Sequence, residues 1–558
     1  MCPATGRHVV VVGASAAGLR CAARLARLES GTTITVVEAR ERYSFAACGL
    51  PYVLSGDIDD LDALRRTADG TLRDGAYFRA VKGLLVRAGW RAERIDAAAH
   101  RVELISPAGE KTALEWDELV LATGARPRRL PGQPDHPRVR SFHTTDDVPP
   151  LVQGLTGGAL SHVAVIGAGL VGCELAEAFR TLWGAEVTLI EAARSPLPGV
   201  CDTEVGRLVE RALVAAGVDV RAGAGVSALE VGARSVAVTT TQGRTEADLA
   251  VIAVGVEPVV ELARQAGVRL GATGAIAVDD RLASSVPHIW AAGDCVEVVH
   301  AVTGEAVHLP LGSLANRQGR TLANVLAGRD DRFPPVAGAV AVKVCDLNVA
   351  AVGLTRAQAT ARGMAARSVW TTSHDRAHYW PEAREIALHL VYEAGSERVL
   401  GVQAVGAGEV AKRIDVAANL IARGATLHDL VNLEHAYAPP YAPALDPLAV
   451  AASVAENQED GIVAATPGEA LPEGSILDVR HEDERDRRPI AAADVVFAPL
   501  ETLRGASQTG GRREWLVVCE RGTRSAEAVR LLAGRGTAAR YLGGGLRWWE
   551  VGGRGGQG

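Results

Sequence analysis

Two cysteines in this 558-residue chain stand in local sequences that could support sulfur chemistry. Cys48 lies in the run 44–52 (SFAACGLPY), and Cys519 opens the loop 519–525 (CERGTRS). A cysteine thiolate is a nucleophile that can attack an oxidised sulfur atom, and nearby positive charge or a helix N-terminus lowers its pKa. Cys48 and Cys519 are therefore the candidate reactive thiols.

The Cys519 loop follows a predicted strand at 515–518 and precedes a predicted helix at 526–532. A loop that directs its backbone N–H groups at a sulfur atom stabilises a thiolate or a terminal persulfide anion. Arg524, at the end of the Cys-x4-Arg pattern, is the candidate side chain for binding an anionic substrate here. Cysteine-based phosphatases use a similar loop, so phosphate chemistry remains an alternative at this point.

Two glycine-rich turns indicate two nucleotide sites. The predicted strand 8–12, turn 13–18, helix 19–28 and strand 34–37 form a βαβ unit, and the same order returns at 162–166, 167–172, 173–182 and 186–190. Such a turn lets a pyrophosphate approach the backbone at a helix N-terminus, and a carboxylate after the second strand accepts from ribose hydroxyls. The predicted residues are Gly13, Ser15, Gly18 and Glu38 at the first site and Gly167, Gly169, Gly172 and Glu191 at the second.

The acidic residue of the second site bears on nucleotide choice. A carboxylate at Glu191 repels a 2′-phosphate and favours NADH, whereas the neighbouring Arg194 leaves NADPH possible. The first site departs from the full glycine pattern, because Ser15 stands where the second glycine is usual.

Composition excludes several classes of function. The formal charge of −7 and the pI near 6.1 give no attraction to nucleic acids or acidic membranes. No run of eighteen apolar residues could span a bilayer, and the N-terminus lacks an export signal, which predicts a cytoplasmic protein. The eight cysteines are scattered without a CxxC pair, so we expect no metal site and mostly reduced, buried, inert thiols.

The segment 289–294 (IWAAGD) resembles the Ala-x-Gly-Asp segment that seats the flavin in flavoproteins with two dinucleotide sites. With the segment 122–124 (ATG) and the two glycine turns, residues 7 to 450 resemble the pyridine nucleotide-disulfide reductase superfamily. The resemblance implies FAD at the first site and NADH at the second. Further cofactor-binding residues that it implies are Thr123, Gly124, Gly255, Gly293 and Asp294.

The run around Cys48 is similar to the coenzyme A-disulfide reductase branch and its persulfide-reducing relatives. Members with an internal redox disulfide carry a second cysteine five residues on, where this chain has Val53, so Cys48 is expected to cycle through a mixed disulfide, persulfide or sulfenic acid. The sequence departs from the branch at Ala47, where Asn is usual. NADH peroxidases and oxidases carry a histidine at the position of Ala16.

The segments 378–381 (HYWP) and 437–441 (YAPPY) resemble motifs of the same branch. They imply a homodimer in which Tyr379 and Tyr437 of one subunit act near the cysteine of the other. The family's coenzyme A contacts fall on six positions of this chain: Arg20, Arg24, Arg27, Ser44, Lys82 and Asn316.

The C-terminal part resembles a rhodanese domain in the segments 476–480 (ILDVR) and 542–549 (LGGGLRWW), which favours sulfur transfer over phosphatase chemistry at Cys519. The predicted fold class is α/β, with two Rossmann-like domains, an α+β dimerisation domain and a rhodanese-like α/β domain. The predicted boundaries are 1–145 and 256–332 for the FAD domain, 146–255 for the NAD(P)H domain, 333–455 for the dimerisation domain, 456–473 for a linker and 474–558 for the rhodanese-like domain.

The sequence therefore predicts an FAD-dependent, NADH-driven reductase of coenzyme A persulfide or disulfide and related polysulfides. Cys48 would be its redox cysteine, and Cys519 would handle sulfane sulfur. An NADH oxidase or peroxidase and a sulfur-responsive redox sensor remain the alternatives.

Overall fold

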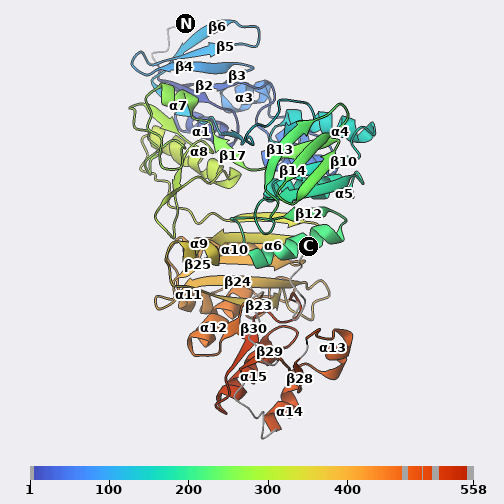
Figure 1. The fold of residues 1–558 in the computed structure, drawn as a ribbon. Coiled ribbons are helices and arrows are strands. Elements are labelled where there is room, and N and C mark those ends of the chain that lie inside the picture. Colours follow the sequence, from blue (N-terminus) through green and yellow to red (C-terminus); the bar gives the residue numbers. More distant parts are fainter. Residues whose placement is uncertain (1–5, 468–475, 493, 506–513, 550–558) are drawn as a thin grey trace. The chain divides into compact units, whose positions relative to one another are not determined.

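The computed structural model describes residues 6–467, 476–492, 494–505 and 514–549. The chain divides into two compact units (Figure 1). One consists of Met1–Ala193 and Ala216–Val336, and the other of Arg194–Ala215 and Ala337–Gly558.

The first unit begins with a parallel five-stranded sheet in the order β18-β7-β1-β2-β3. Its strands are β1 (His8–Val12), β2 (Thr33–Glu38), β3 (Leu85–Ala88), β7 (Glu118–Leu121) and β18 (Ile289–Ala291). The four valines of β1 are buried, as expected for a central parallel strand that is covered on both faces. Helix α1 (Ala16–Leu28) packs beside α8 (Gly312–Leu326), so segments 300 residues apart cover one face of this sheet.

A second parallel sheet of the first unit has the order β12-β11-β10-β16-β9. Its strands are β9 (Val139–Ser141), β10 (His162–Ile166), β11 (Glu186–Glu191), β12 (Asp219–Ala222) and β16 (Leu249–Ile252). Helix α5 (Leu170–Thr181) packs against β10 and β11, and helix α4 (Val148–Thr156) precedes β10 in the chain. Both predicted βαβ units are present, and each helix begins three residues before its predicted start.

Smaller elements complete the first unit. The antiparallel ones are β4 (Arg91–Asp96), β5 (Arg101–Ile105) and β6 (Lys111–Glu115); β13 (Val226–Val231), β14 (Val236–Thr240) and β15 (Gly243–Ala247); β8 (Ala125–Pro127) with β17 (Val256–Pro258); and β19 (Val298–Val299) with β20 (Ala306–Val307). The short helices are η1 (Ala47–Gly49), α2 (Leu50–Leu54), η2 (Ala63–Arg65), α3 (Gly75–Lys82), η3 (Thr145–Asp147) and α7 (Glu261–Gln265).

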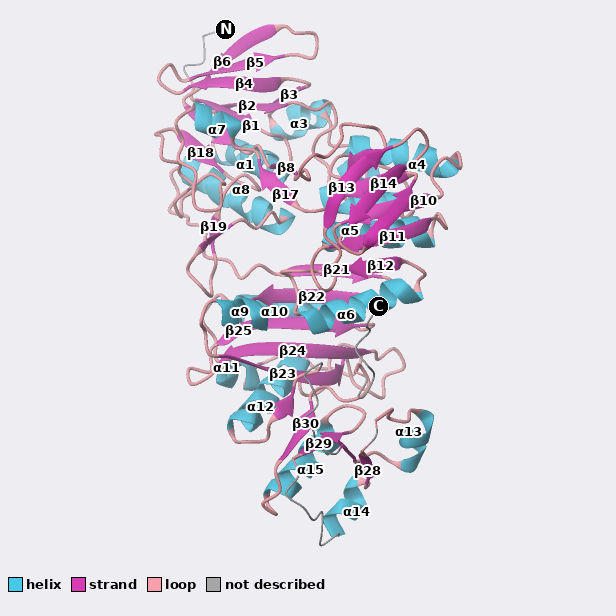
Figure 2. Ribbon diagram, in the orientation of Figure 1, coloured by secondary structure: helices cyan, strands magenta, loops and turns pink. Residues whose placement is uncertain are grey.

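The second unit contains an antiparallel sheet in the order β21-β22-β25-β24-β23, with helix α10 lying across it (Figure 2). Its strands are β21 (Val340–Val344), β22 (Leu347–Gly353), β23 (Ala366–His374), β24 (Glu385–Glu393) and β25 (Val399–Gly406). Its helices are α6 (Thr203–Ala215), α9 (Arg356–Ala361), α10 (Ala411–Ile421), α11 (Leu427–Val431) and α12 (Pro447–Glu459). This is the α+β domain that the sequence predicts.

The second unit ends in a parallel sheet with the order β26-β30-β29-β27-β28. Its strands are β26 (Ala464–Ala465), β27 (Ile476–Asp478), β28 (Val495–Phe497), β29 (Trp515–Val518) and β30 (Ala539–Leu542), and its helices are α13 (Glu482–Arg487), α14 (Leu500–Gly505) and α15 (Thr523–Ala533). This C-terminal α/β domain also agrees with the predicted fold class.

The structure differs from the predicted boundaries in two places. The predicted linker 456–473 contains the end of α12 and the strand β26, which pairs with β30, while residues 468–475 lie outside the described residues. Residues 194–215, assigned from the sequence to the NAD(P)H domain, group with the second unit instead. Buried Asp202 explains this, because its carboxylate accepts from the N–H groups of Arg356 and Ala357 at the start of α9.

Within the described residues, no helix is both long and apolar enough to cross a membrane.

Candidate active site

The first glycine turn connects β1 to α1. Gly13 has φ +113°, and a Cβ there would collide with the carbonyl oxygen of Ala122 on the adjoining strand segment. A Cβ on Gly18 would collide with the carbonyl oxygen of Gly13, so both positions need glycine to bring α1 close to the sheet. Ser15 is the N-cap residue of α1 and makes no side-chain capping hydrogen bond.

A cavity of about 790 Å³ opens at this turn. Its lining includes seven of the predicted residues: Gly13, Ser15, Glu38, Thr123, Gly124, Gly293 and Asp294. One carboxylate oxygen of Glu38 accepts from the N–H of Ala14 at 2.9 Å and the other from the N–H of Arg40 at 3.0 Å. Burial raises the pKa of the Asp294 carboxyl. The size of the cavity, the glycine turn and the helix N-terminus fit a dinucleotide cofactor.

The second glycine turn repeats the geometry of the first. Gly167 has φ +101°, and a Cβ on Gly172 would collide with the carbonyl oxygen of Gly167. The carboxylate of Glu191 accepts from the N–H groups of Ala168 at 2.7 Å and Ala193 at 2.8 Å. A Cβ on Gly169 would meet no protein atom within 4 Å, which leaves the start of α5 open to a bound nucleotide. Gly255, with φ +91°, has the same open surroundings.

Cys48 lies in η1, directly before α2, and is the only exposed cysteine in the part of the chain that the structure describes. The segment is fixed to the first glycine turn by a hydrogen bond from the N–H of Ser44 to the carbonyl of Ala14 at 3.0 Å. Ala47, the neighbour of Cys48, lines the 790 Å³ cavity. The predicted redox thiol thus lies beside the predicted flavin site.

Tyr52 and Glu174 form a pair that the sequence analysis missed. Tyr52 follows Cys48 by one turn, and its hydroxyl donates to Oε1 of Glu174 on α5 at 3.1 Å. Burial, with a smaller contribution from Glu177, raises the pKa of the Glu174 carboxyl to about 7. Burial and the charge of Glu174 raise the pKa of Tyr52 as well. A carboxyl that can exchange a proton near neutral pH therefore lies close to the Cys48 segment.

Basic side chains gather where α1 lies beside α8. Burial and the positive charges of four other arginines lower the pKa of Arg24; these are Arg320, Arg329, Arg27 and Arg20. Three members of this cluster are predicted coenzyme A contacts, whereas Arg320 and Arg329 were not predicted. Among the remaining predicted contacts, Ser44 is buried, Lys82 lies over the ring of Tyr77, and the amide of Asn316 donates to the carbonyl of Gly312.

The structure brings Tyr379 and Tyr437 together in the second unit. The neighbouring phenol of Tyr437 raises the pKa of Tyr379, and the two residues are 51% and 64% exposed, respectively. Their loops are held by Arg413, whose side chain is 1% exposed. Its guanidinium donates to the carbonyl of Asp375 at 2.6 Å and lies 3.3 Å from Oδ2 of Asp446.

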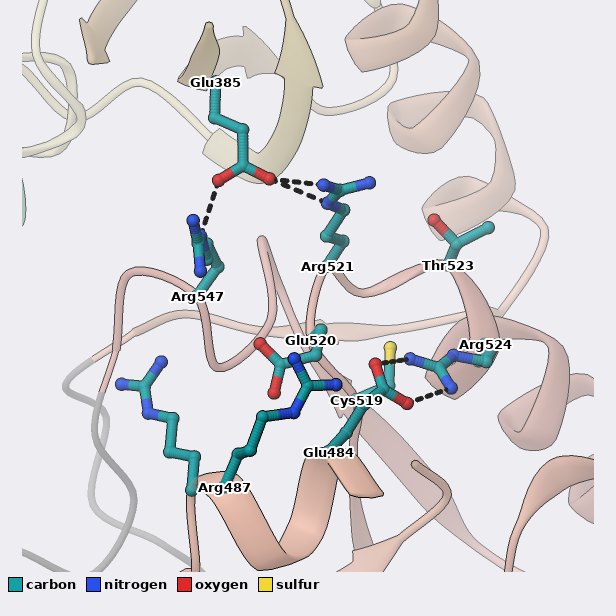
Figure 3. A pocket seen from close by; sticks show the side chains of 10 residues that line it. Glu385, Glu484, Arg487, Cys519, Glu520, Arg521, Thr523, Arg524 and Arg547 are labelled. Carbon is teal, nitrogen blue, oxygen red and sulfur yellow. Dashed lines mark hydrogen bonds and ion pairs between the residues drawn. The ribbon is translucent and has the colours of Figure 1, made fainter. Parts of the chain in front are cut away.

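Cys519 directly follows β29 and is buried in the loop before α15. The N–H of Gly522, whose φ is +94°, donates to its Sγ at 3.1 Å, and Ser525 Oγ lies 3.4 Å from the same sulfur. This geometry stabilises a thiolate or a persulfide anion. The expected anion ligand Arg524 makes two hydrogen bonds of 2.6 Å to the carboxylate of Glu484 (Figure 3). These bonds lower the pKa of Glu484 to about 2.

Comparison with known proteins follows the same division of the chain. Residues 7–319 match the family of pyridine nucleotide-disulphide oxidoreductases, and residues 339–449 match the dimerisation domain of that family. A curated relative from Pyrococcus furiosus, an NAD(P)H sulfur oxidoreductase (CoA-dependent), is 36% identical over 450 residues, which cover 80% of this chain and 99% of the relative.

Two solved structures extend the similarity into the C-terminal region. The NAD-dependent persulfide reductase from A. fulgidus is 38% identical with a TM-score of 0.92, covering 97% of this chain and 100% of that chain. The reduced Bacillus anthracis CoADR-RHD is 31% identical with a TM-score of 0.89, covering 97% of each chain.

These matches confirm the fold class and the superfamily inferred from the glycine turns and the Cys48 segment. The chain belongs to the pyridine nucleotide-disulphide oxidoreductase family.

Proposed function

We propose that this chain is a homodimeric, FAD-dependent reductase, driven by NADH or NADPH, of coenzyme A persulfide or disulfide and related polysulfides. We further propose that Cys48 is its single redox cysteine and that it works in the cytoplasm. The observation that carries the proposal is the exposed Cys48 thiol in a segment that is hydrogen-bonded to the first glycine turn and lines the dinucleotide cavity through Ala47. The relatives named above as CoA-dependent or persulfide-reducing support the choice of substrate.

The chain's own thiol performs the first chemical step. Attack by the Cys48 thiolate on a disulfide breaks its S–S bond, joins one half to Cys48 and releases the other half as a thiolate. With a persulfide, attack at the carbon-bound sulfur releases hydrosulfide instead. When bound, the flavin and nicotinamide supply the two electrons that cleave the mixed disulfide and restore the thiolate.

The two phenols suit a role at the leaving group. Tyr379 and Tyr437 are exposed neighbours, and a phenol can donate a hydrogen bond or a proton to a departing thiolate. We propose that they act on the Cys48 site of the partner subunit. Arg413 is their positioning residue, because it connects the two loops that carry them.

The arginine cluster at α1 and α8 suits the phosphates of coenzyme A. Arg20, Arg24 and Arg27 supply guanidinium groups that bind phosphate oxygens, and Arg320 and Arg329 add charge to the same cluster. We include Ser44, Lys82 and Asn316 in the coenzyme A site as predicted, and assign FAD to the first glycine turn and the nicotinamide nucleotide to the second.

For the C-terminal domain we propose sulfur transfer at Cys519. The loop that surrounds its sulfur suits a persulfide, which Cys519 would accept from a donor or pass to an acceptor thiol.

Anaerobic turnover of the purified protein with NADH tests these assignments. Cys48→Ser should abolish reduction of coenzyme A disulfide and persulfide while FAD stays bound. Cys519→Ser should keep disulfide reduction and lose sulfur transfer from thiosulfate, and Cys345→Ser is the matched control for replacing a thiol. Equal loss of both activities in Cys519→Ser would contradict the division of labour. Fast oxygen or peroxide reduction with no sulfur reduction would favour an oxidase or peroxidase, and no turnover with any acceptor would favour a sensor.

A further inference from the structure

The pocket above Cys519 carries a small net positive charge. It has a volume of about 670 Å³ and is lined by Cys519, five arginines and three glutamates, so positive charges exceed negative ones by two. The arginines are Arg487, Arg488, Arg521, Arg524 and Arg547. Guanidinium groups bind oxyanions through paired hydrogen bonds, so a pocket of this lining suits an anionic sulfur donor.

One wall of the pocket comes from a different domain. Glu385 is the first residue of β24, in the antiparallel sheet, and its side chain is 15% exposed. Its Oε1 accepts from Nε of Arg521 at 2.9 Å and from Nη2 at 2.5 Å, and its Oε2 accepts from Nε of Arg547 at 2.5 Å. Figure 3 shows both arginines reaching away from Cys519 toward this carboxylate.

Glu385 therefore occupies the positions that a ligand's oxygens would take on these two arginines. Burial opposes ionisation of Glu385, but the hydrogen bonds from Arg547 and Arg521 outweigh it and hold the pKa of the carboxyl below its usual value. The side chain is thus a carboxylate at neutral pH. An anion that uses Arg521 or Arg547 must displace Glu385. Arg487 and Arg488 have other partners, because Arg487 pairs with Asp483 at 2.5 Å and Arg488 donates to the carbonyl of Trp549 at 3.3 Å.

We propose that Glu385 sets the anion selectivity of the Cys519 site by competing with the sulfur donor for Arg521 and Arg547. This inference rests on the proposed sulfur transfer at Cys519. A small anion bound at Arg521 and Arg547 must displace Glu385. A larger polyanionic donor can also reach Arg487, whose ion pair with Asp483 is exposed to solvent and therefore weak. Removing this carboxylate should therefore raise the affinity for a small anion.

Thiosulfate is the probe for this test. In the transfer step, the Cys519 thiolate attacks the outer sulfur of thiosulfate, the S–S bond of thiosulfate breaks, sulfite leaves with the bonding electrons, and Cys519 becomes a persulfide anion. No further oxidant or reductant is needed. Binding is measured separately from transfer by isothermal titration of thiosulfate into the Cys519→Ser protein, in which the chemical step is absent.

In that background, Glu385→Gln should lower the dissociation constant of thiosulfate about five-fold, as expected when charge-assisted donors are freed. Thr372→Val is the matched control, because Thr372 donates to the carbonyl of Gly544 at 2.6 Å in the same domain contact and carries no charge. It should leave the dissociation constant unchanged. An unchanged constant in Glu385→Gln, an equal change in Thr372→Val, or no thiosulfate binding to any of these proteins would overturn the proposal.

A double variant tests whether the effect passes through the arginines. With Arg521→Gln in place, Glu385→Gln should change the dissociation constant by clearly less than five-fold, and an undiminished effect would refute the assigned contact. The transfer rate of the protein with Cys519 intact reports on the proposed function by itself. If this protein transfers no sulfur from thiosulfate while Glu385→Gln still changes the dissociation constant as expected, the role of Cys519 is rejected and the role of Glu385 is kept.

Discussion

Replacement of Glu174 by glutamine should stabilise the protein relative to the native chain, and this gain in stability should be larger at pH 8 than at pH 5. Burial is the main reason that the pKa of this carboxyl rises from its ordinary value of 4.5 to about 7. The folded protein therefore holds the proton more tightly than the unfolded chain, and its stability falls as the pH rises from about 4.5 to about 7. Glutamine removes this cost and keeps Oε1 as the acceptor for Tyr52.

The magnitude follows from the shift. One pKa unit corresponds to about 1.4 kcal/mol, so the rise from 4.5 to about 7 sets an upper limit of about 3.5 kcal/mol. Solvent access to this half-buried side chain reduces the expected value to about 2 kcal/mol. Urea unfolding at pH 5, 6 and 8 should show the glutamine variant gaining this amount over the native chain, with a plateau above pH 7. Glu186→Gln, at an exposed position, should show no such trend. A stability difference that is constant across this range, or that falls with pH, would refute the assigned burial of the carboxyl.

Two further perturbations follow from the geometry. Gly172→Ala places a Cβ against the carbonyl oxygen of Gly167, so it should lower the thermal midpoint of unfolding and abolish NADH-dependent turnover. In Gly169→Ala the new Cβ meets open space, so this variant should only raise KM for NADH. An equal loss of thermal stability in both variants would contradict the geometry. Arg413→Met leaves buried Asp446 without its ion-pair partner and should lower the free energy of unfolding by about 3–5 kcal/mol. Adding Asp446→Asn should recover part of this loss. No recovery in the double variant would argue against the Arg413–Asp446 ion pair.

The sequence predicted strands better than helix starts. The strands His8–Val12, His162–Ile166 and Trp515–Val518 have the predicted bounds, because continuous apolar runs of this length are typical of parallel strands buried on both faces. Helices α1 and α5 begin inside the glycine turns, where the first helical turn keeps its N–H groups free and its sequence resembles a loop. The two alanines of β26 give no strand signal at all, because only their pairing with β30 defines them.

The site was predictable where its chemistry is local in the chain. The glycine turns and the Cys48 and Cys519 loops are short segments whose residue types determine their geometry. The pairs Tyr52–Glu174 and Glu385–Arg521 join residues 122 and 136 positions apart, so no spacing in the sequence indicates them. They depend on how strands and helices pack, which a pattern of residue types does not specify.

The two candidate thiols differ from the other cysteines through their surroundings. Burial raises the pKa of Cys21 to about 12 and raises the pKa of Cys295, so these thiols stay protonated and inert. Cys48 differs from them because it is exposed, and buried Cys519 differs because its sulfur accepts from the N–H of Gly522. An exposed thiol in the single chain is accessible to a bulky disulfide, whereas a buried thiol is accessible only to a donor small enough to enter its pocket. Exchange with large thiols therefore suits Cys48, and transfer of a single sulfur atom suits Cys519.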